Sequence, residues 1–565
     1  MKATYFLSES ELFKYTSTFN IDGDGLESYI FSRLNTGAIV MKRNQLGILP
    51  ALAYDHALFY KGFLLNAVAR IITFTMFAPE SNEISFQLKG YRRQLAFEYS
   101  KPILDRKGVT ELEDKSNVIE KELARTVGGY REAIKQVNWH EVQQKLKTNE
   151  AAIEFVHYRY TNKKPTDSIM YSALIVKPES IEPIFISLFE EKSLDSLLNT
   201  KTERKADYVN NLYTLADRGA RPIESPIRSL YEILWQPMEK ELVGVKKIYY
   251  SPTGLLHRIN LDAIARSSTK TLADQYQLIE LNSTRELVIP SQVKIANNEA
   301  VLFGGIQYDQ DSSLLNPEPL ITSRSRGELS FKNVDSTLRG GSWNYLPGTE
   351  DEVNTIGTMM MASGLDVKTK KGYQATEESF KNIGANNSPS PKILHIASHG
   401  YFFPDPKSTS NIAGFENQKE PVFKMSEHPM LRSGLILAGG NAAWQGKQTL
   451  EGREDGVLTA YEISQMNLSN TELVVLSACE TGLGEIQGNE GVYGLQRAFK
   501  IAGAKYIIMS LWQVPDKQTS LLMTTFYKKW LKEKMTIPDA FQSAQKELRN
   551  AGLDPYQWAG FILCE

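Results

Sequence analysis

The stretch LVVLSACETGLG, residues 473–484, ends an unbroken apolar run at Cys479 and follows it with glycines. A second run of the same kind, KILHIAS (392–398), ends immediately before His399 and Gly400. Continuous apolar runs of this length are typical of strands that are buried on both faces of a parallel sheet. Because the carboxyl ends of parallel strands meet at one edge of a sheet, neighbouring strands would bring a thiol and an imidazole together there.

Further short apolar runs alternate with helical segments from about residue 246 to the end of the sequence. These runs are KKIYYSP, QLIELN, AVLFGG, DVKTKKG, SGLILAG and KYIIMSLW. They predict an α/β fold with a mostly parallel sheet sandwiched by helices. Three strand-like runs, 151–160, 168–178 and 182–189, come before them, and the polar segment NKKPTD (162–167) is the expected hairpin loop between the first two.

The sequence divides into three predicted parts. Residues 1–148 have helical spacing and form an N-terminal helical region, which resembles the end of a TPR-like array although it contains no 34-residue period. Residues 149–245 form a supporting α/β part, and residues 246–565 form the catalytic part.

Composition excludes several classes of protein. The net charge of −2 gives no overall basic field for nucleic acid or an anionic membrane. Two cysteines are too few for a disulfide scaffold, and the start of the chain lacks the apolar core of a signal peptide. No apolar run approaches the ~20 residues of a membrane span. We therefore expect a soluble, cytoplasmic protein with no nucleic-acid or membrane partner. The seven histidines and two cysteines have no zinc-ligand spacing, so we expect no metal and no cofactor.

A thiol beside an imidazole is the arrangement of a base-assisted nucleophile. Cys479 is the candidate nucleophile and His399 its candidate partner, and the backbone N–H groups of Gly400 and Cys479 are candidate donors to an oxyanion. The alternative for Cys479 is a buried core cysteine. His395 has period-2 spacing from His399, so we expect it on the same face of the strand as a buried, hydrogen-bonded histidine.

These segments resemble a known family. ILHIASHGYF (393–402) and LVVLSACETGLGEIQGNEGVYGLQRAFKIAGAKYIIMSLWQVPD (473–516) are similar to the signature segments of CHAT domains, which are caspase-fold cysteine peptidases similar to separases and often fused to TPR arrays. YSPTGLLHRINLDAI (250–264), FGGIQYD (303–309), LPGTEDEV (346–353), YQAT (373–376), RSGLILAGGN (432–441), DGVLTAYEI (455–463), FYKKW (526–530) and WAGFILCE (558–565) extend the resemblance over about 150–565. It implies that Cys479 is the nucleophile and His399 the catalytic histidine of an endopeptidase that carries out regulated, limited cleavage of protein substrates.

Two acidic residues are candidate substrate-binding groups. Asp516 resembles the acid that separases use to bind a basic P1 side chain, and the alternative is a helix N-cap for residues 517–532. Glu480 follows the nucleophile and either lines the same pocket or faces solvent.

Other functions remain open at the level of sequence. The chain could be a catalytically silent caspase-like scaffold, or a thiol amidase or acyltransferase that acts on a small molecule. A regulatory protein partner is expected at the helical N-terminal region. The long polar segment 404–429 is a candidate gate because structureless loops of this length are often functional.

Overall fold

The computed structural model describes residues 49–61, 107–126, 137–162, 164–198, 205–214, 229–289, 296–310, 342–385, 388–404, 428–445, 453–478, 481–486 and 491–565, together with single positions between 84 and 98. In this part of the chain, no helix is both long enough and apolar enough to cross a membrane.

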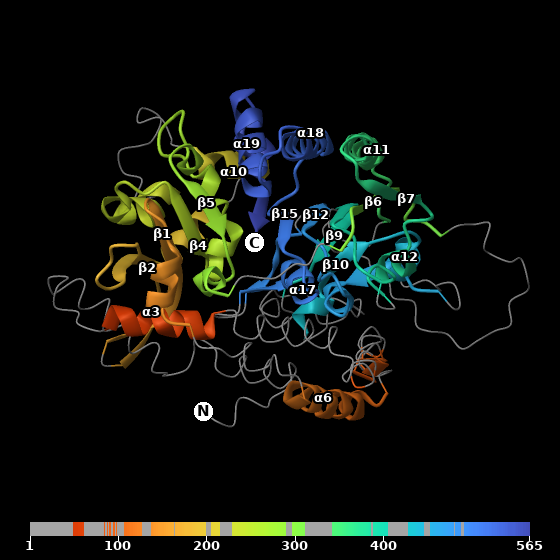
Figure 1. The fold of residues 1–565 in the computed structure, drawn as a ribbon, viewed down its shortest axis with the longest axis horizontal. Coiled ribbons are helices and arrows are strands. Elements are labelled where there is room, and N and C mark those ends of the chain that lie inside the picture. The colour runs from red at the N-terminus through yellow and green to blue at the C-terminus, as the bar shows by residue number, and fades with distance from the viewer. Residues whose placement is uncertain are drawn as a thin grey trace, which may run out of the picture.

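An eleven-stranded sheet forms the centre of the molecule (Figure 1), in the order β3-β2-β1-β4-β5-β16-β15-β12-β8-β6-β7. Its strands are β1 (Glu150–Asn162), β2 (Lys164–Val176), β3 (Ile184–Glu190), β4 (Lys247–Ser251), β5 (Gln277–Glu280), β6 (Glu299–Ile306), β7 (Asp366–Gly372), β8 (Ile393–Ala397), β12 (Leu473–Ser477), β15 (Tyr506–Ser510) and β16 (Phe561–Cys564). The predicted mostly parallel sheet is confirmed, with an antiparallel meander of β1, β2 and β3 at one end.

The sheet has two halves whose strands run in opposite directions. β1, β4 and β5 are parallel to one another, and so are β7, β6, β8, β12 and β15. β16 joins the halves because it pairs parallel to β5, where Cys564 lies opposite Glu280, and antiparallel to β15. The carboxyl ends of the two halves therefore lie at opposite edges of the sheet. β4 and β5 follow the predicted boundary near residue 245 but lie beside β1, so residues 247–280 belong to the same half of the sheet as residues 150–190. The division of the chain at residue 245 stays a prediction.

Two smaller sheets lie beside the large one. β9 (His399–Phe402), β10 (Ser433–Ile436) and β11 (Val457–Thr459) form one, and β13 (Gly484–Ile486) and β14 (Val492–Gly494) form the other. The hairpin between β1 and β2 is tighter than predicted, because Asn162 pairs with Lys164 and much of the expected loop is strand.

Helices cover both faces of the large sheet, as predicted. The described helices are α3 (Leu49–Tyr60), α6 (Val109–Thr126), α8 (Trp139–Lys145), α9 (Glu191–Leu198), α10 (Lys205–Tyr213), α11 (Pro347–Ala362), α12 (Glu377–Lys381), α15 (Gly440–Trp444), α16 (Ala460–Ile463), α17 (Leu495–Ile501), α18 (Asp516–Tyr527), α19 (Ile537–Asn550) and α20 (Pro555–Trp558), and α6 lies apart from the sheet in Figure 1. Helical turns also occupy Tyr231–Trp235 and Gln236–Leu242. α3, α6 and α8 are the described helices of the predicted N-terminal helical region.

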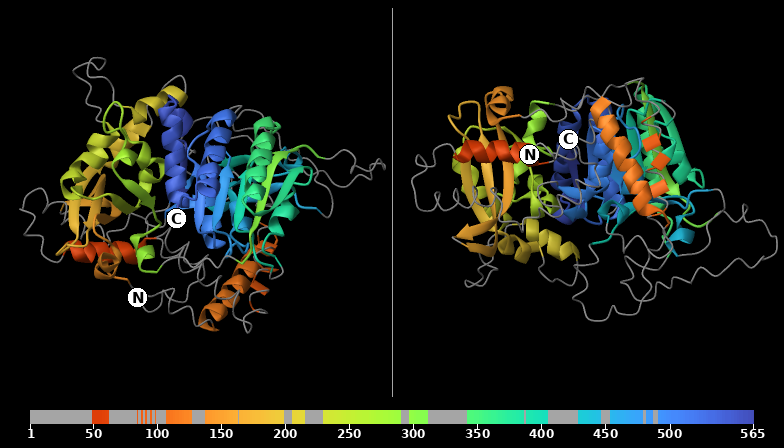
Figure 2. Two further views of the ribbon diagram at one scale, coloured as in Figure 1. Left: turned by 45° about the horizontal axis from the view of Figure 1, so that its top comes forward. Right: turned by 90° about the horizontal axis from the view of Figure 1, so that it is seen from below.

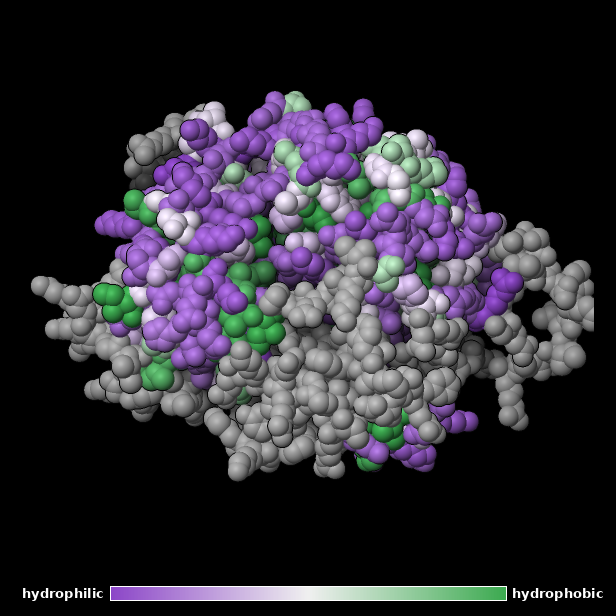
Figure 3. All heavy atoms as spheres, viewed as in Figure 1, coloured by the Kyte–Doolittle hydropathy of each residue, from purple (hydrophilic) through white to green (hydrophobic). Residues whose placement is uncertain are grey.

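α18 packs between α11 and α19 on one face of the sheet, where the green and blue helices lie side by side in the left view of Figure 2. The sequence of α19 explains its position. Thr536 caps its first turn by accepting a hydrogen bond from the Asp539 N–H, and its buried residues recur at helical spacing. The outer surface over α18 and α19 is mostly hydrophilic, as Figure 3 shows at the top of the molecule.

The large hydrophobic core lies on both faces of β6, β8, β12 and β15. Every residue of β8 and of β12 is buried, which is why both appear in the sequence as mostly apolar runs without polar alternation, interrupted in β8 by His395. A second core fills the space between α3, α8 and the outer face of β1 and β2. The core therefore holds the ends of β8 and β12, at Ala397 and Ser477, side by side in the centre of the sheet.

Candidate active site

β8 and β12 are neighbouring parallel strands, as the sequence predicts. Their register places Val475 opposite His395 and Ser477 opposite Ala397. Both strands therefore reach the carboxyl edge of their half of the sheet at the same level. His399 lies two positions after Ala397, and Cys479 lies two positions after Ser477 in the sequence.

His399 is not the last residue of β8, which corrects the sequence interpretation. β8 ends at Ala397, and His399 begins β9, where it pairs with Ile436 of β10 instead of with β12. The change of partner occurs at Ser398, whose hydroxyl donates to the Ile436 carbonyl. The period-2 argument that relates His395 to His399 assumed one continuous strand, so it does not apply.

Three residues surround the His399 ring. Its Nε2 lies 2.8 Å from the carbonyl oxygen of Asn344. The rings of Trp343 and Tyr308 lie 4.8 and 4.9 Å from the imidazole, centroid to centroid. Because a carbonyl only accepts hydrogen bonds, Nε2 carries a proton, and in the neutral imidazole Nδ1 is left as the acceptor. His399 can therefore take a proton from a thiol through Nδ1.

The electrostatic surroundings favour neutral His399. Burial lowers the pKa of His399 below its ordinary value, while the hydrogen bond to the Asn344 carbonyl and the charge of Asp516 act in the opposite direction. The imidazole is thus a base near neutral pH, as proton abstraction requires.

Asn441 holds the segment that covers His399. Its Oδ1 accepts from the Trp343 N–H at 2.6 Å, and its Nδ2 donates to the Trp343 carbonyl at 3.1 Å and to Asp309 Oδ1 at 2.8 Å. Asn441 is 2% exposed, so these hydrogen bonds are protected from water. This one side chain therefore fixes the backbone immediately before the Asn344 carbonyl.

Some predicted site residues lie outside the described part of the chain. They are Cys479, Glu480 and residues 405–427 of the predicted gate segment. The flanking residues Ala478 and Thr481 are buried, and the Ser510 N–H donates to Thr481 Oγ1 at 3.0 Å. Gly400, the other predicted oxyanion donor, lies half-buried in β9 opposite Leu435.

Asp516 is the first residue of α18, and the N-cap position belongs to Pro515, which makes no side-chain cap. The alternative role as an N-cap is therefore wrong. An added Cβ on Gly348 would lie 3.2 Å from the Asp516 Cβ, so the first turns of α11 and α18 are in contact. Carboxylates are favoured at helix N-termini, which lets Asp516 occupy this position beside His399.

A cavity with a mostly apolar lining lies between these two helix N-termini and the ends of β8, β12 and β15. The hydroxyl and carboxylate side chains in its lining are Thr349, Glu352, Ser398, Ser477, Ser510, Asp516 and Thr519. The cavity connects the strand end before His399 with the strand end before Cys479.

His395 occupies a buried network at the base of this region. Its Nε2 lies 2.8 Å from Glu352 Oε1 of α11, and its Nδ1 lies 3.2 Å from the Tyr527 hydroxyl of α18. His395 is fully buried and Glu352 is 2% exposed. The predicted buried, hydrogen-bonded role of His395 is confirmed, and the network joins β8 to both helices that border the cavity.

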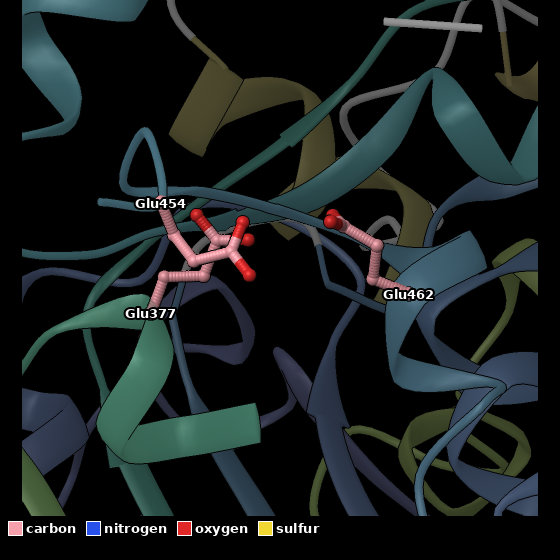
Figure 4. A group of neighbouring side chains, drawn as sticks. All are labelled: Glu377, Glu454 and Glu462. Atoms are coloured by element: carbon pink, nitrogen blue, oxygen red, sulfur yellow. The ribbon is translucent and has the colours of Figure 1, made fainter. Parts of the chain in front are cut away.

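A second group of acids could hold a cation. Figure 4 shows Glu377, Glu454 and Glu462 gathered from α12, the loop before β11 and α16. Lys381 already lies among them, with its Nζ 3.2, 2.8 and 3.0 Å from the three carboxylates. Burial, followed by the charge of Glu462, raises the pKa of Glu377 well above its ordinary value. The lysine supplies the counter-charge, so the cluster links these segments without a metal.

Sequence reasoning did not identify Tyr308, Asn344, Glu352 or Asn441 as parts of the site. The segments FGGIQYD, LPGTEDEV and RSGLILAGGN, quoted for the family resemblance, contain Tyr308, Glu352 and Asn441. The fact that these three residues lie in segments shared with the family was the one indication of their role in the sequence. Asn344 acts through its backbone carbonyl, which every residue type has, so the sequence could not indicate this role.

The sequence of this chain matches one family model and two curated proteins. The model of the CHAT domain family matches residues 224–564, more than half of the chain. Tetratricopeptide repeat protein 28 of Homo sapiens is 23% identical over 397 residues, which cover 66% of this chain and 14% of that protein. The Mus musculus protein of the same name is 23% identical over 399 residues, again 66% of this chain and 14% of its own length. This chain thus spans about a seventh of these relatives.

Two solved structures also match at low similarity. The Saccharomyces cerevisiae separase–securin complex matches with a TM-score of 0.38 and 10% identity over 81% of this chain and 33% of that chain. The Arg-specific cysteine proteinase gingipain R matches with a TM-score of 0.34 and 10% identity over 64% of this chain and 73% of that chain. At this level of similarity, neither structure informs the activity of this chain.

Proposed function

Because the chain belongs to the CHAT domain family, we propose that it is a cysteine endopeptidase that cleaves protein substrates through Cys479 and His399. The observation that carries this proposal is the register of β8 and β12, in which Ala397 lies opposite Ser477. His399 follows Ala397 by two positions in the sequence, and Cys479 follows Ser477 by two positions. The neutral imidazole of His399, with Nδ1 available, supports the same role.

The proposed reaction has two stages. His399 Nδ1 takes the thiol proton of Cys479, and the thiolate attacks the scissile carbonyl carbon. The negative oxygen is stabilised by the backbone N–H groups of Gly400 and Cys479. His399 then protonates the leaving amine as the C–N bond breaks, and water hydrolyses the remaining thioester with His399 as the base.

Asn344 and Asn441 have supporting roles in this proposal. The Asn344 carbonyl keeps the Nε2 proton in place and thereby leaves Nδ1 to face the thiol. Asn441 holds the preceding backbone through Trp343. Neither contacts the reacting atoms, so both are positioning residues.

We propose Asp516 as a binding group for a basic P1 side chain, either arginine or lysine. Its contact with the first turn of α11, its position in the cavity lining and its charge effect on His399 support this role. Glu480 stays a predicted pocket residue, and a regulatory partner at residues 1–148 stays a prediction. So does regulation by the segment 404–429.

The test is the appearance of new N-termini. Wild-type protein and Cys479→Ala are incubated with a lysate of the source cells, and new N-termini are sequenced. Cys564→Ala is the matched control, because Cys564 is buried and its Sγ lies 3.1 Å from Gln496 Nε2. The proposal predicts new N-termini with wild type and Cys564→Ala and none with Cys479→Ala.

The two alternative functions give different results. A catalytically silent scaffold would give identical N-termini for wild type and Cys479→Ala. A thiol amidase or acyltransferase would show no new N-termini but would consume a small amide in a Cys479-dependent reaction. Each of these outcomes would contradict the endopeptidase proposal.

A further inference from the structure

The base of the cavity contains a buried carboxylate, that of Glu352, which no Lys or Arg pairs with among the described residues. Burial raises the pKa of Tyr527 well above its ordinary value, so its hydroxyl keeps its proton and can donate to His395 Nδ1. His395 Nε2–H then donates to Glu352 Oε1. The imidazole of His395 is thus the partner of Glu352, and no Lys or Arg pairs with this carboxylate among the described residues.

The other oxygen of Glu352 has no hydrogen-bond partner among the described residues. The hydroxyls nearby differ in what they already bind. Ser510 donates to the Ala478 carbonyl at 2.6 Å, and Ser398 donates to the Ile436 carbonyl. Ser477, which is 5% exposed, has a buried Oγ with no hydrogen-bond partner in the described part of the chain. A buried polar atom without a partner is uncommon and indicates a ligand or water.

The described lining of the cavity contains two carboxylates, several hydroxyls and no Lys, Arg or His. Such a lining accepts hydrogen bonds from a cation and repels an anion. The cavity is partly open, and its volume of about 20 Å³ is room for one water molecule or a group of that size. An ammonium group has this size and three donors, whereas a guanidinium is planar and larger.

We propose that Glu352 and Ser477 form the inner end of the P1 pocket and bind the ammonium group of a substrate lysine. The inference rests on the proposed peptidase function and makes it more specific. Asp516 lies beyond the end of β15, near His399, whereas Glu352 contacts His395 four residues earlier in the chain. Asp516 therefore attracts the cation at the entrance, and Glu352 and Ser477 bind it at the end of the pocket.

The test uses n-butylamine, which has the length and charge of a lysine side chain. Native protein is alkylated with iodoacetamide, and the rate at Cys479 is followed by mass spectrometry with and without n-butylamine. We expect n-butylamine to slow alkylation of Cys479 at least threefold, n-butanol to have no effect and n-butylguanidine to protect less than n-butylamine.

Two variants locate the protection. Glu352→Gln keeps an oxygen that can accept from His395 and should abolish protection, while Glu350→Gln, on the exposed side of the same helix, should keep it. Ser477→Ala removes an unpartnered hydroxyl, so it should fold at least as stably as wild type and still lose protection several-fold. The Ser477 variant keeps the test informative if Glu352→Gln does not fold.

The outcomes separate the two proposals. If Cys479 does not react at all, the peptidase proposal fails. If Cys479 reacts but n-butylamine gives no protection, or protects Glu352→Gln and Ser477→Ala as well as wild type, the pocket inference is wrong and the peptidase proposal stands. Stronger protection by n-butylguanidine would contradict the choice of lysine.

Discussion

Two buried carboxylates, Glu154 in the first half of the sheet and Glu352 on α11 against the second half, have different partners. Glu154, in β1, accepts from the Lys61 ammonium at 3.0 Å through one oxygen. Its other oxygen accepts from the Ser283 hydroxyl and from both the N–H and the hydroxyl of Thr284. Lys61 also donates to two backbone carbonyls. The first half thus supplies a cation for Glu154 and hydrogen-bond donors for both of its oxygens.

Glu352, in the second half, has one imidazole partner and lines a cavity that contains an unpartnered hydroxyl. A closed polar network stabilises a fold once its charges are paired, whereas an incomplete one is available to a ligand. The difference is that the Glu154 network is complete among the described residues, whereas the Glu352 network leaves an acceptor and a hydroxyl for a ligand, as the proposed pocket requires.

The largest expected effect comes from unpairing the closed network. Glu154→Gln leaves the buried Lys61 ammonium without its counter-charge, and breaking such a pair costs about 3–5 kcal/mol. Urea denaturation should show this loss in the free energy of unfolding. The double variant Lys61→Met/Glu154→Gln removes both charges and should recover most of it. A loss below about 1 kcal/mol in the single variant would contradict the claim that Lys61 and Glu154 form a buried pair that stabilises the fold.

The second effect concerns the segment over His399. Asn441→Ala removes the hydrogen bonds that hold Trp343 and so loosens the Asn344 carbonyl on His399 Nε2. We expect alkylation of Cys479 at pH 7 to slow about tenfold, which corresponds to about 1.4 kcal/mol. Asn354→Ala, on the exposed part of α11, is the control and should react like wild type. Equal rates in both variants would show that Asn441 does not position the imidazole.

The third effect is a shift in pKa. Since burial lowers the pKa of His399, the imidazole should titrate below 6.5 and stay neutral at pH 7. Cysteine reactivity supported by His399 should therefore persist as the pH falls and disappear only below that lowered pKa. Asp516→Asn removes a charge that raises the pKa, so it should move this loss to lower pH by less than about one unit. The NMR titration of His399 measures both values, and a rise in Asp516→Asn would contradict the account.

The smallest effect is the counterpart of the first. Glu352→Gln removes a carboxylate that no described Lys or Arg pairs with and keeps an acceptor for His395. Its free energy of unfolding should therefore stay within about 1 kcal/mol of wild type, measured by the same urea titration as Glu154→Gln. A loss of about 3–5 kcal/mol would mean that Glu352 is already paired and that the two halves do not differ.

The sequence correctly predicted those parts of the fold that depend on the local pattern of apolar and polar residues. β8 and β12 are buried on both faces, so their apolar runs predicted parallel neighbouring strands. The break between β8 and β9 was not predictable, because Ser398 exchanges one partner strand for another and no residue pattern records that change. The position of Asp516 was also misjudged, because Pro515 takes the N-cap position.

Only those residues of the candidate site that have reactive or charged side chains could be predicted from the sequence. His399, Cys479 and Asp516 have reactive or charged side chains beside strand ends, so they could be selected from the sequence. Asn344 contributes a backbone carbonyl, and Glu352 reaches His395 from 43 positions away in the chain. Contacts of this kind depend on how α11 packs on the sheet, which local pattern does not specify.

The reactivity of the two cysteines tests the central claim most directly. Burial raises the pKa of Cys564 to about 12, so this thiol should be inert in the native protein. We predict that iodoacetamide at pH 7 modifies Cys479 alone and that His399→Ala slows this reaction about a hundredfold. Equal labelling of both cysteines, or labelling of Cys479 at the same rate with and without His399, would contradict a catalytic pair at the ends of β8 and β12.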